Sequence, residues 1–152
     1  MATSAQDVKN SYPLPVFYYE VKIDGMDPIA FSEVSGLALQ HETITYRDGM
    51  SYKEGPKYMP GILQPINVSL KKGVMRGGRQ LYDWINSIKV NTVEKKDILI
   101  SLKDEADDPV VTWKVKDAFP TKMDAPAFSG TSNDVAIESL DLMATYLTIE
   151  YH

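Results

Sequence analysis

The sequence predicts a mainly β protein, an antiparallel β-sandwich or half-barrel with one flanking α-helix. Three observations support this prediction. Short runs of β-branched and aromatic residues alternate with polar residues, turn-forming residues separate these runs, and only one stretch has apolar residues at helical spacing. The length of 152 residues is typical of one domain. We therefore expect a single β-domain over residues 13–152, preceded by a flexible arm at residues 1–12.

The first half of the domain contains three expected strands. They are VFYYEVKI at residues 16–23, IAFSEVSG at residues 29–36 and LALQHETITY at residues 37–46. Because they follow one another closely, we expect them to pair as an antiparallel meander.

The segment RDGMSYKEGPKYMPG, residues 47–61, interrupts the strands. It contains three glycines and two prolines and follows neither apolar period, so it predicts a long loop. Such long loops are uncommon in compact domains unless they are functional or disordered. Since this one carries aromatic residues, we expect it to pack on a surface that the chain does not supply.

The second half supplies the remaining strands and the only expected helix. PINVSLKK, residues 65–72, alternates apolar and polar residues and predicts a strand. RQLYDWINSI, residues 79–88, predicts a helix whose buried stripe consists of Leu81, Trp84, Ile85 and Ile88.

Four further runs complete about eight expected strands. They are DILISLKD, PVVTWKVKD, VAIESLD and YLTIEY, and the acidic turn DEADD joins the first two. We expect Trp113 to lie on the core face of its strand and Trp84 on the buried stripe of the helix. A platform of tryptophans for a sugar or a base is the less favoured alternative.

Composition limits the possible partners. The net charge of -5 does not favour nucleic acid, which normally selects a basic surface, and the absence of cysteine excludes disulfides and thiolate metal sites. We find no signal peptide and no apolar run long enough to span a membrane. We expect the protein to be made in the cytoplasm and, where it leaves the cell, to do so without a Sec-type signal.

No motif predicts catalysis, a cofactor or a metal. Gly73 and Gly78 have the spacing of a phosphate-binding loop, but Arg79 and Gln80 replace its Lys-Ser/Thr pair, which favours a structural turn. The acidic residues at 104–108 lack the glycine and glutamate of a calcium loop and favour a solvated turn. The two histidines, His41 and His152, lack ligand or triad spacing.

The motifs together resemble a known family. The succession includes PLPVFYYEVKIDG, FSEVSGL, ITYRDG, KYMPG, INVSLKKGVMRGGRQLYDWINSI, DILISLKDEADDPVVTWKVKDAFPTKMDAPAF and NDVAIESLDLMATYLTIEY. From about Tyr12 to Tyr151 it resembles the phage tail tube protein family. It is similar in particular to the inner-tube proteins of extracellular contractile injection systems, of the antifeeding-prophage and Photorhabdus-virulence-cassette type.

The resemblance implies a tail-tube or Hcp-like subunit without catalytic activity. Such subunits form hexameric rings that stack into a hollow tube inside a contractile sheath. The implied partners are further copies of the chain, a sheath protein, baseplate and spike hub proteins, and protein cargo in the lumen. The particle is assembled in the bacterial cytoplasm and can be released from the cell.

The resemblance also implies roles for two groups of residues. Candidate subunit contacts are Tyr46, Arg47, Asp48, Tyr52, Lys53, Tyr58 and Met59. Candidate residues of a polar lumen or outer face are Asn67, Ser69, Lys71, Thr112, Lys114 and Lys116. The N-terminal arm is expected to dock between rings.

Three alternatives remain at this point. The chain could form a specialised ring at the junction of baseplate and spike, or belong to a phage tail tube. It could also be a monomeric ligand-binding β-domain that uses the Gly73–Arg79 turn or a tryptophan face.

Overall fold

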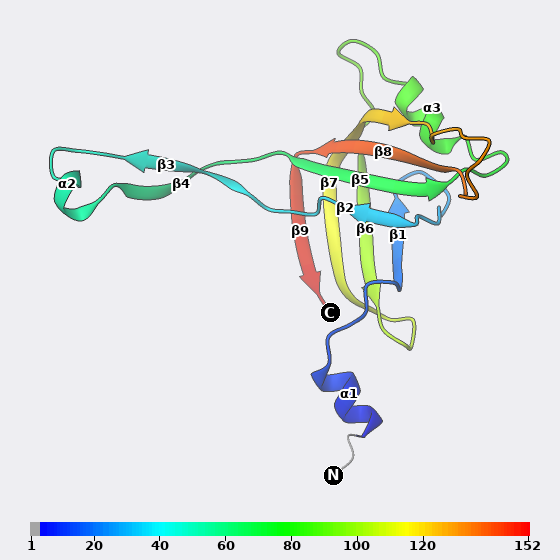
Figure 1. The fold of residues 1–152 in the computed structure, drawn as a ribbon, viewed down its shortest axis with the longest axis horizontal. Coiled ribbons are helices and arrows are strands. Elements are labelled where there is room, and N and C mark those ends of the chain that lie inside the picture. The colour runs from blue at the N-terminus through cyan, green and yellow to red at the C-terminus, as the bar shows by residue number, and fades with distance from the viewer. Residues whose placement is uncertain (1–3) are drawn as a thin grey trace.

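The computed structural model describes residues 4–152 and shows a mainly antiparallel β fold, which confirms the predicted fold class (Figure 1). Nine strands and three helices lie in the described part of the chain. The helices are α1 (Ala5–Ser11), α2 (Ser51–Glu54) and α3 (Gln80–Asn86). The strands are β1 (Tyr19–Ile23), β2 (Glu33–Ser35), β3 (His41–Tyr46), β4 (Lys57–Leu63), β5 (Ile66–Gly73), β6 (Lys96–Lys103), β7 (Pro109–Asp124), β8 (Ile137–Ala144) and β9 (Tyr146–Tyr151).

Two layers of strands form the body. We call layer A the part ordered β1-β6-β7-β9, and layer B the part ordered β2-β5-β8-β7. The strands of layer B run across those of layer A, and α3 lies at one end of the body (Figure 1). The sheet remains open, so the fold is a sandwich or half-barrel rather than a closed barrel.

Strand β7 belongs to both layers because it bends in the middle. Its first part pairs with β9 as far as Lys116, and its second part pairs with β8 from Phe119 onward. Between them Asp117 adopts a φ of 56° and donates its backbone N–H to Asp97 Oδ1 at 3.1 Å. A local irregularity of this kind lets one strand turn the corner between two sheets.

The hydrophobic core lies between the layers and under α3. Strand β5 buries every second residue, as its alternating sequence predicts, and β8 supplies the facing side chains. The buried hydrophobic residues are Val21, Ile23, Phe31, Ile66, Val68, Leu70, Leu81, Trp84, Ile98, Ile100, Val115, Ala118, Leu140, Leu142, Ala144 and Leu147. Trp113 is partly buried against this core.

Helix α3 is shorter than its sequence pattern predicts. Leu81 and Trp84 are buried, and the Trp84 indole donates to the carbonyl of Glu94 at 2.9 Å. Ile85 is half-buried, and Ile88, also half-buried, lies two residues beyond the end of the helix at Asn86. The helix therefore contacts the core through a single turn.

The predicted meander is wrong. Strand β1 pairs with β6, β2 with β5, and β3 with β4, so none of the first three strands pairs with another of the three. The body instead joins strands that are distant in sequence, which local patterns do not reveal.

Two parts of the chain project from the body (Figure 1). Strands β3 and β4 form a two-stranded ribbon that carries α2 at its tip, and we call residues 41–63 the arm. The predicted loop at residues 47–61 therefore contains a helix and most of a strand. Helix α1 projects separately from the layer A end and adds a second unpredicted helix.

Candidate assembly surfaces

The arm presents apolar side chains to solvent. Every residue of β3 is exposed, and no residue of β4 is buried. The large exposed hydrophobic residues of the arm are Ile44, Tyr46, Met50, Tyr52, Tyr58, Met59 and Ile62. An isolated two-stranded hairpin is at best marginally stable in water, so this ribbon needs a surface that covers it.

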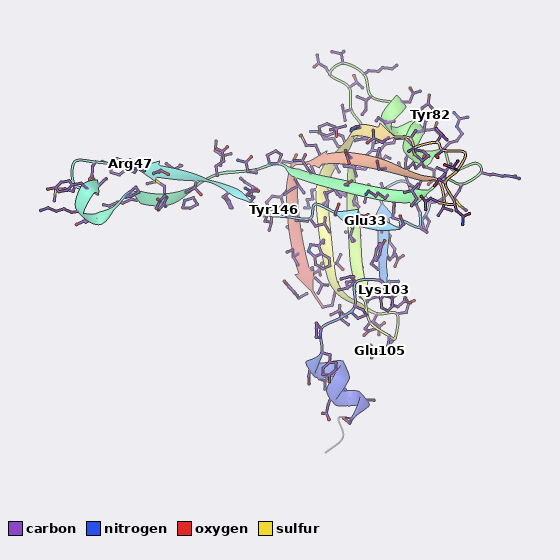
Figure 2. All side chains as sticks on the ribbon, in the orientation of Figure 1. Glu33, Arg47, Tyr82, Lys103, Glu105 and Tyr146 are labelled. Atoms are coloured by element: carbon purple, nitrogen blue, oxygen red, sulfur yellow. The ribbon has the colours of Figure 1, made fainter. Side chains whose placement is uncertain are left out.

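The structure gathers the predicted subunit contacts on this arm. Tyr46 ends β3, Tyr52 and Lys53 lie on α2, and Tyr58 and Met59 lie on β4. Arg47 and Asp48 lie between β3 and the turn that precedes α2, and Figure 2 shows Arg47 far from the body. All seven residues are exposed in the single subunit.

The turn at the arm tip is held by its own hydrogen bonds. Met50 N donates to Asp48 Oδ1 at 2.9 Å, and Asp48 N donates to Ser51 Oγ at 2.9 Å. These bonds satisfy backbone groups that precede the short helix. The tip therefore keeps a defined shape, which presents Tyr52 with 78% of its surface exposed.

The outer face of layer A is polar, and ion pairs join its strands. Lys103 Nζ lies 2.7 Å from Glu20 Oε2, which links β6 to β1. Lys114 Nζ lies 2.7 Å from Glu150 Oε2, which links β7 to β9. The hydrogen bond from Lys103 lowers the pKa of Glu20, and the hydrogen bond from Lys114 lowers the pKa of Glu150.

Thr112 is a correction to the predicted polar face. Thr112 is only 6% exposed, because its hydroxyl lies within a hydrogen-bonded row across the strands. The Thr112 Oγ1 atom is 3.1 Å from Ser101 Oγ and 2.9 Å from His152 Nε2. Lys116 is exposed on this face, and the side chain of Lys114 is 41% exposed.

The other predicted polar residues lie on the opposite side of the body. Asn67 and Lys71 are exposed on the outer face of layer B, and Ser69 is half-buried between them. Ser69 Oγ donates to Asp141 Oδ1 at 3.0 Å, and Lys71 Nζ lies 3.4 Å from Glu33 Oε2. The predicted set thus divides between two faces that the sandwich core separates.

A third polar cluster fixes the point where the N-terminal segment joins the body. The Tyr18 hydroxyl donates to Asp107 Oδ1 at 2.5 Å, and the Lys103 backbone N–H donates to the Tyr18 carbonyl at 3.0 Å. The bond from Tyr18, and then that from Lys103, lowers the pKa of Asp107. The hydrogen bond between the Tyr18 hydroxyl and Asp107 also raises the pKa of Tyr18. Figure 2 places Lys103 beside the β6–β7 turn, at the end from which α1 projects.

Both outermost strands of layer A have open edges. Among residues 4–152, strands β1 and β9 each pair on one side only, and neither contains proline. The outermost strands of layer B differ, because β2 is only three residues long and the second part of β7 contains Pro120. A proline or a very short strand hinders pairing with a further strand. The edges of layer A are therefore better suited than those of layer B to pair with a strand of another chain.

The body also contains a buried ion pair that the sequence patterns did not predict. Lys72 follows Leu70 in the inward register of β5, and its Nζ lies 2.7 Å from Glu138 Oε1 on β8. The two side chains are 6% and 15% exposed. A lysine at an inward position of a strand was the available signal, since an inward charge needs a partner.

The side chains of the described residues form no metal centre. Over residues 4–152 no group of three His, Asp or Glu side chains is placed to hold a metal ion. In the turn at residues 104–108, Asp104 Oδ1 instead accepts bonds from the backbone of Ala106 and Asp108. No helix in the described part of the chain is long and apolar enough to cross a membrane.

The fold and these surfaces define a mainly β structural subunit with open sheet edges and projecting segments. The sequence matches the family described as T4-like virus tail tube protein gp19 over residues 15–148. The chain belongs to this tail tube family, whose members are structural components.

Solved structures show the same relationship. A chain of the extracellular contractile injection system PVC sheath-tube complex in its extended state is 43% identical, with a TM-score of 0.90 over 99% of this chain and 100% of that chain. A chain of the anti-feeding prophage cap, the AFP tube terminating cap, is 42% identical, with a TM-score of 0.87 over 100% of both chains.

A more distant structure shares the fold alone. Hcp1 from Flavobacterium johnsoniae is 15% identical, with a TM-score of 0.54 over 90% of this chain and 97% of that chain. A comparison with curated protein sequences found no significant match.

Proposed function

We propose that this protein is the inner-tube subunit of an extracellular contractile injection system. It forms hexameric rings that stack into a hollow tube, which the contraction of a surrounding sheath drives through a target envelope. Its 43% identity to a chain of a sheath-tube complex supports this role. Its partners are then further copies of itself, sheath protein and the baseplate and spike hub, and it performs no catalysis.

The direction of the strands in layer A is the observation that carries this proposal. Strand β1 runs antiparallel to β6, β6 to β7, and β7 to β9, so β1 and β9 run in opposite directions. When β9 of one subunit meets β1 of the next, the new pair is antiparallel as well. Repeated pairing gives one continuous antiparallel sheet, and its closure removes every open edge of layer A.

This arrangement assigns the two polar faces. The core, layer B and α3 all lie on one side of layer A, so its outer face is the one that lines the lumen. The ion pairs Lys103–Glu20 and Lys114–Glu150 balance the charge of this wall. A wall with paired charges lets protein cargo move without strong adhesion. Asn67, Ser69 and Lys71 then face outward, toward the sheath.

The projecting segments have separate roles in the tube. The arm packs on a neighbouring subunit, where its apolar side chains gain the cover that they lack in the monomer. The N-terminal segment, including α1, docks between rings from its anchor at Tyr18. The tube is assembled in the cytoplasm and leaves the cell within the particle.

A second candidate is a ring that ends the tube or joins it to the baseplate. The 42% identity to a chain of a tube terminating cap favours this candidate. Such a subunit forms a ring but does not stack with itself, because one side of the ring meets a different protein.

Electron microscopy of the purified protein in negative stain, with light scattering across concentration, tests these roles. Stacked tubes support the tube subunit, and single rings support the terminal ring. A strictly monomeric protein that binds a small ligand saturably would contradict both and support the ligand-binding alternative.

Cysteine labelling tests which face lines the lumen, since the chain has no cysteine of its own. We expect a maleimide coupled to a large protein to react with Asn67→Cys in assembled tubes and to leave Lys116→Cys unmodified. Both variants should react in dissociated subunits. Equal labelling of the two positions in tubes would contradict the lumen assignment.

A further inference from the structure

The body has a projecting loop at one end and an apolar groove at the other. The α3–β6 loop, residues 87–95, extends beyond α3 at the end opposite α1 (Figure 1). The groove lies where layer A extends beyond β2 toward α1 (Figure 1). Strand β6 joins the two features, because it begins directly after the loop and its last residues lie beside the groove.

The tip of the α3–β6 loop is held in one shape. Lys89 and Thr92 form an isolated β-bridge, in which the backbone N–H of each residue donates to the carbonyl of the other at 2.9 Å. Asn91 lies between them with a φ of 61°, which asparagine tolerates. This turn presents Val90 with 91% of its surface exposed. An apolar side chain on a rigid projecting turn favours a contact with another surface.

The groove at the other end is apolar and small. Leu102 of β6 and Trp113 of β7 line it from layer A, and Val34 of β2 and the nearby Leu37 line it as well. Its volume is about 290 Å³, which suits a few side chains. Trp113, Val34 and Leu37 are only partly buried. A further apolar side chain in the groove would therefore complete their burial.

The loop and the groove lie on the same side of layer A. The loop begins at α3, which packs on the core, and its Glu94 carbonyl accepts the Trp84 indole N–H at 2.9 Å. The groove is lined by core-facing side chains of β6 and β7. In a tube, both features therefore lie just outside the lumen wall, one on each face of the ring. When rings stack in one orientation, the loop of each subunit faces the groove side of the next ring.

The charges of the two features are complementary. Glu33 is acidic and lines the groove, and none of the described residues that line it is basic. Lys89 is exposed next to Val90 at the tip of the loop. The Glu33 side chain is 56% exposed although Lys71 lies 3.4 Å away, so its carboxylate is accessible to a second cation. Complementary charge of this kind sets the specificity and register of a contact.

We propose that the α3–β6 loop of one ring inserts Val90 into the Glu33–Leu37–Trp113 groove of a subunit in the next ring. This inference rests on the proposed function, because it requires rings that stack. The occupant of the groove is a second copy of this chain. Since the loop lies on one face of the ring and the groove on the other, the contact fixes the direction of stacking and the rotation of each ring on the next.

Crosslinking between engineered cysteines tests the contact in assembled tubes, since the chain has no cysteine of its own. A chain with both Val90→Cys and Glu33→Cys is assembled and treated with a short bis-maleimide. We expect a covalent ladder that continues beyond the mass of one hexamer, because each ring is linked to the next. A ladder that ends at one hexamer places the loop on a neighbour in the same ring and overturns the inference.

Two matched pairs of cysteines control this experiment. Val90→Cys with Asn67→Cys should give no crosslink, because Asn67 is exposed on the outer face of layer B. Tyr52→Cys with Glu33→Cys tests the arm as the occupant of the groove, and we expect no crosslink there either. A crosslink from Tyr52→Cys in place of one from Val90→Cys would overturn the inference.

The variant Val90→Asp tests whether stacking needs this contact. Val90 is 91% exposed in the subunit, so we expect the thermal midpoint of the monomer to stay unchanged. In the tube the new carboxylate would be buried beside Glu33, which is unfavourable. We expect electron microscopy to show rings without tubes. The matched control Val135→Asp, at an 82% exposed valine of the β7–β8 connection, should form normal tubes. Normal tubes from Val90→Asp would overturn the inference.

Failure of the inference and failure of the proposed function are distinct results. Wild-type tubes, together with tubes of the Val90→Cys and Glu33→Cys chain that give no crosslink, contradict the contact alone. A wild-type protein that forms no stacked rings contradicts the proposed tube subunit, and the inference then falls with it.

Discussion

The body and the arm use the same antiparallel pairing but differ in what stabilises them. In the body, inward side chains such as Leu70 and Leu140 are only 1% exposed. In the arm, no residue of β3 or β4 is buried, and Ile44 is 48% exposed. Backbone pairing alone contributes little net stability. The comparison shows that the body has its own core, whereas the arm buries none of its strand residues within the subunit. Under the proposed function, another subunit covers the arm.

Deletion of the arm tip should have the largest effect. Removal of residues 50–58 eliminates α2 and the start of β4, and no core residue lies in this segment. We expect a folded monomer with an unchanged thermal midpoint that forms no tubes. Circular dichroism measures the fold, and electron microscopy measures assembly. If the variant that lacks residues 50–58 forms normal tubes, the arm is not needed for assembly and the prediction is wrong.

Loss of one partner of the buried ion pair should have the largest effect on the body. Glu138→Leu leaves the Lys72 ammonium buried without its partner, and we expect the free energy of unfolding to fall by about 3–5 kcal/mol. The double variant Lys72→Met with Glu138→Leu should recover most of this loss. Urea unfolding of the single and double variants measures the coupling, and a double variant as unstable as Glu138→Leu would contradict it.

A pair of truncations sharpens the comparison between core and arm. Leu140→Ala should lower the free energy of unfolding by about 2–5 kcal/mol, because it leaves a cavity between the layers. Ile44→Ala removes a similar side chain from the arm and should change monomer stability by less than about 0.5 kcal/mol. Equal effects in the monomer would show that the arm packs on its own body.

The smallest expected effect concerns the anchor of the N-terminal segment. The folded-state pKa of Asp107 is lowered, so its contribution to stability is present at neutral pH and is lost as pH falls through this pKa. Asp107→Asn keeps a residue type that tolerates the local φ of 67° but removes the charge. We expect its thermal midpoint to be below that of the wild type at pH 7 and to approach it near pH 3. A constant difference across this range would exclude the charge as the cause.

The sequence predicted the elements whose side chains alternate between core and solvent. Strand β5 is the clearest case, since INVSLKK has one buried face and one exposed face. The turn between β6 and β7 was also predictable, because its acidic residues cap their own backbone. The pairing of β1 with β6 was not predictable, since it depends on contacts between distant segments.

The arm was only half predictable, for a physical reason. The aromatic content of residues 47–61 predicted contacts with another surface, which stays a prediction. The strand within this segment was missed, because β4 has no buried face and therefore shows no alternation. Pro60 and Gly61 also argue against a strand. Gly61 fits because a Cβ there would lie 2.9 Å from the Glu42 carbonyl oxygen, beside the bulge in the ribbon. Likewise, the prediction of a solvent-exposed Thr112 was wrong, because Ser101 and His152, which come from other segments of the chain, lie beside its hydroxyl and bury it.

The position of α1 gives the proposed tube a polarity. The helix projects from one end of layer A, next to the β6–β7 turn (Figure 1). All subunits of a ring share one orientation, so the helices emerge from one side of the ring and leave the other side bare. The two ends of a growing tube are then chemically different, and elongation from a baseplate has a defined direction. A terminator of the same fold needs to match only one of these ends to fix the length of the tube.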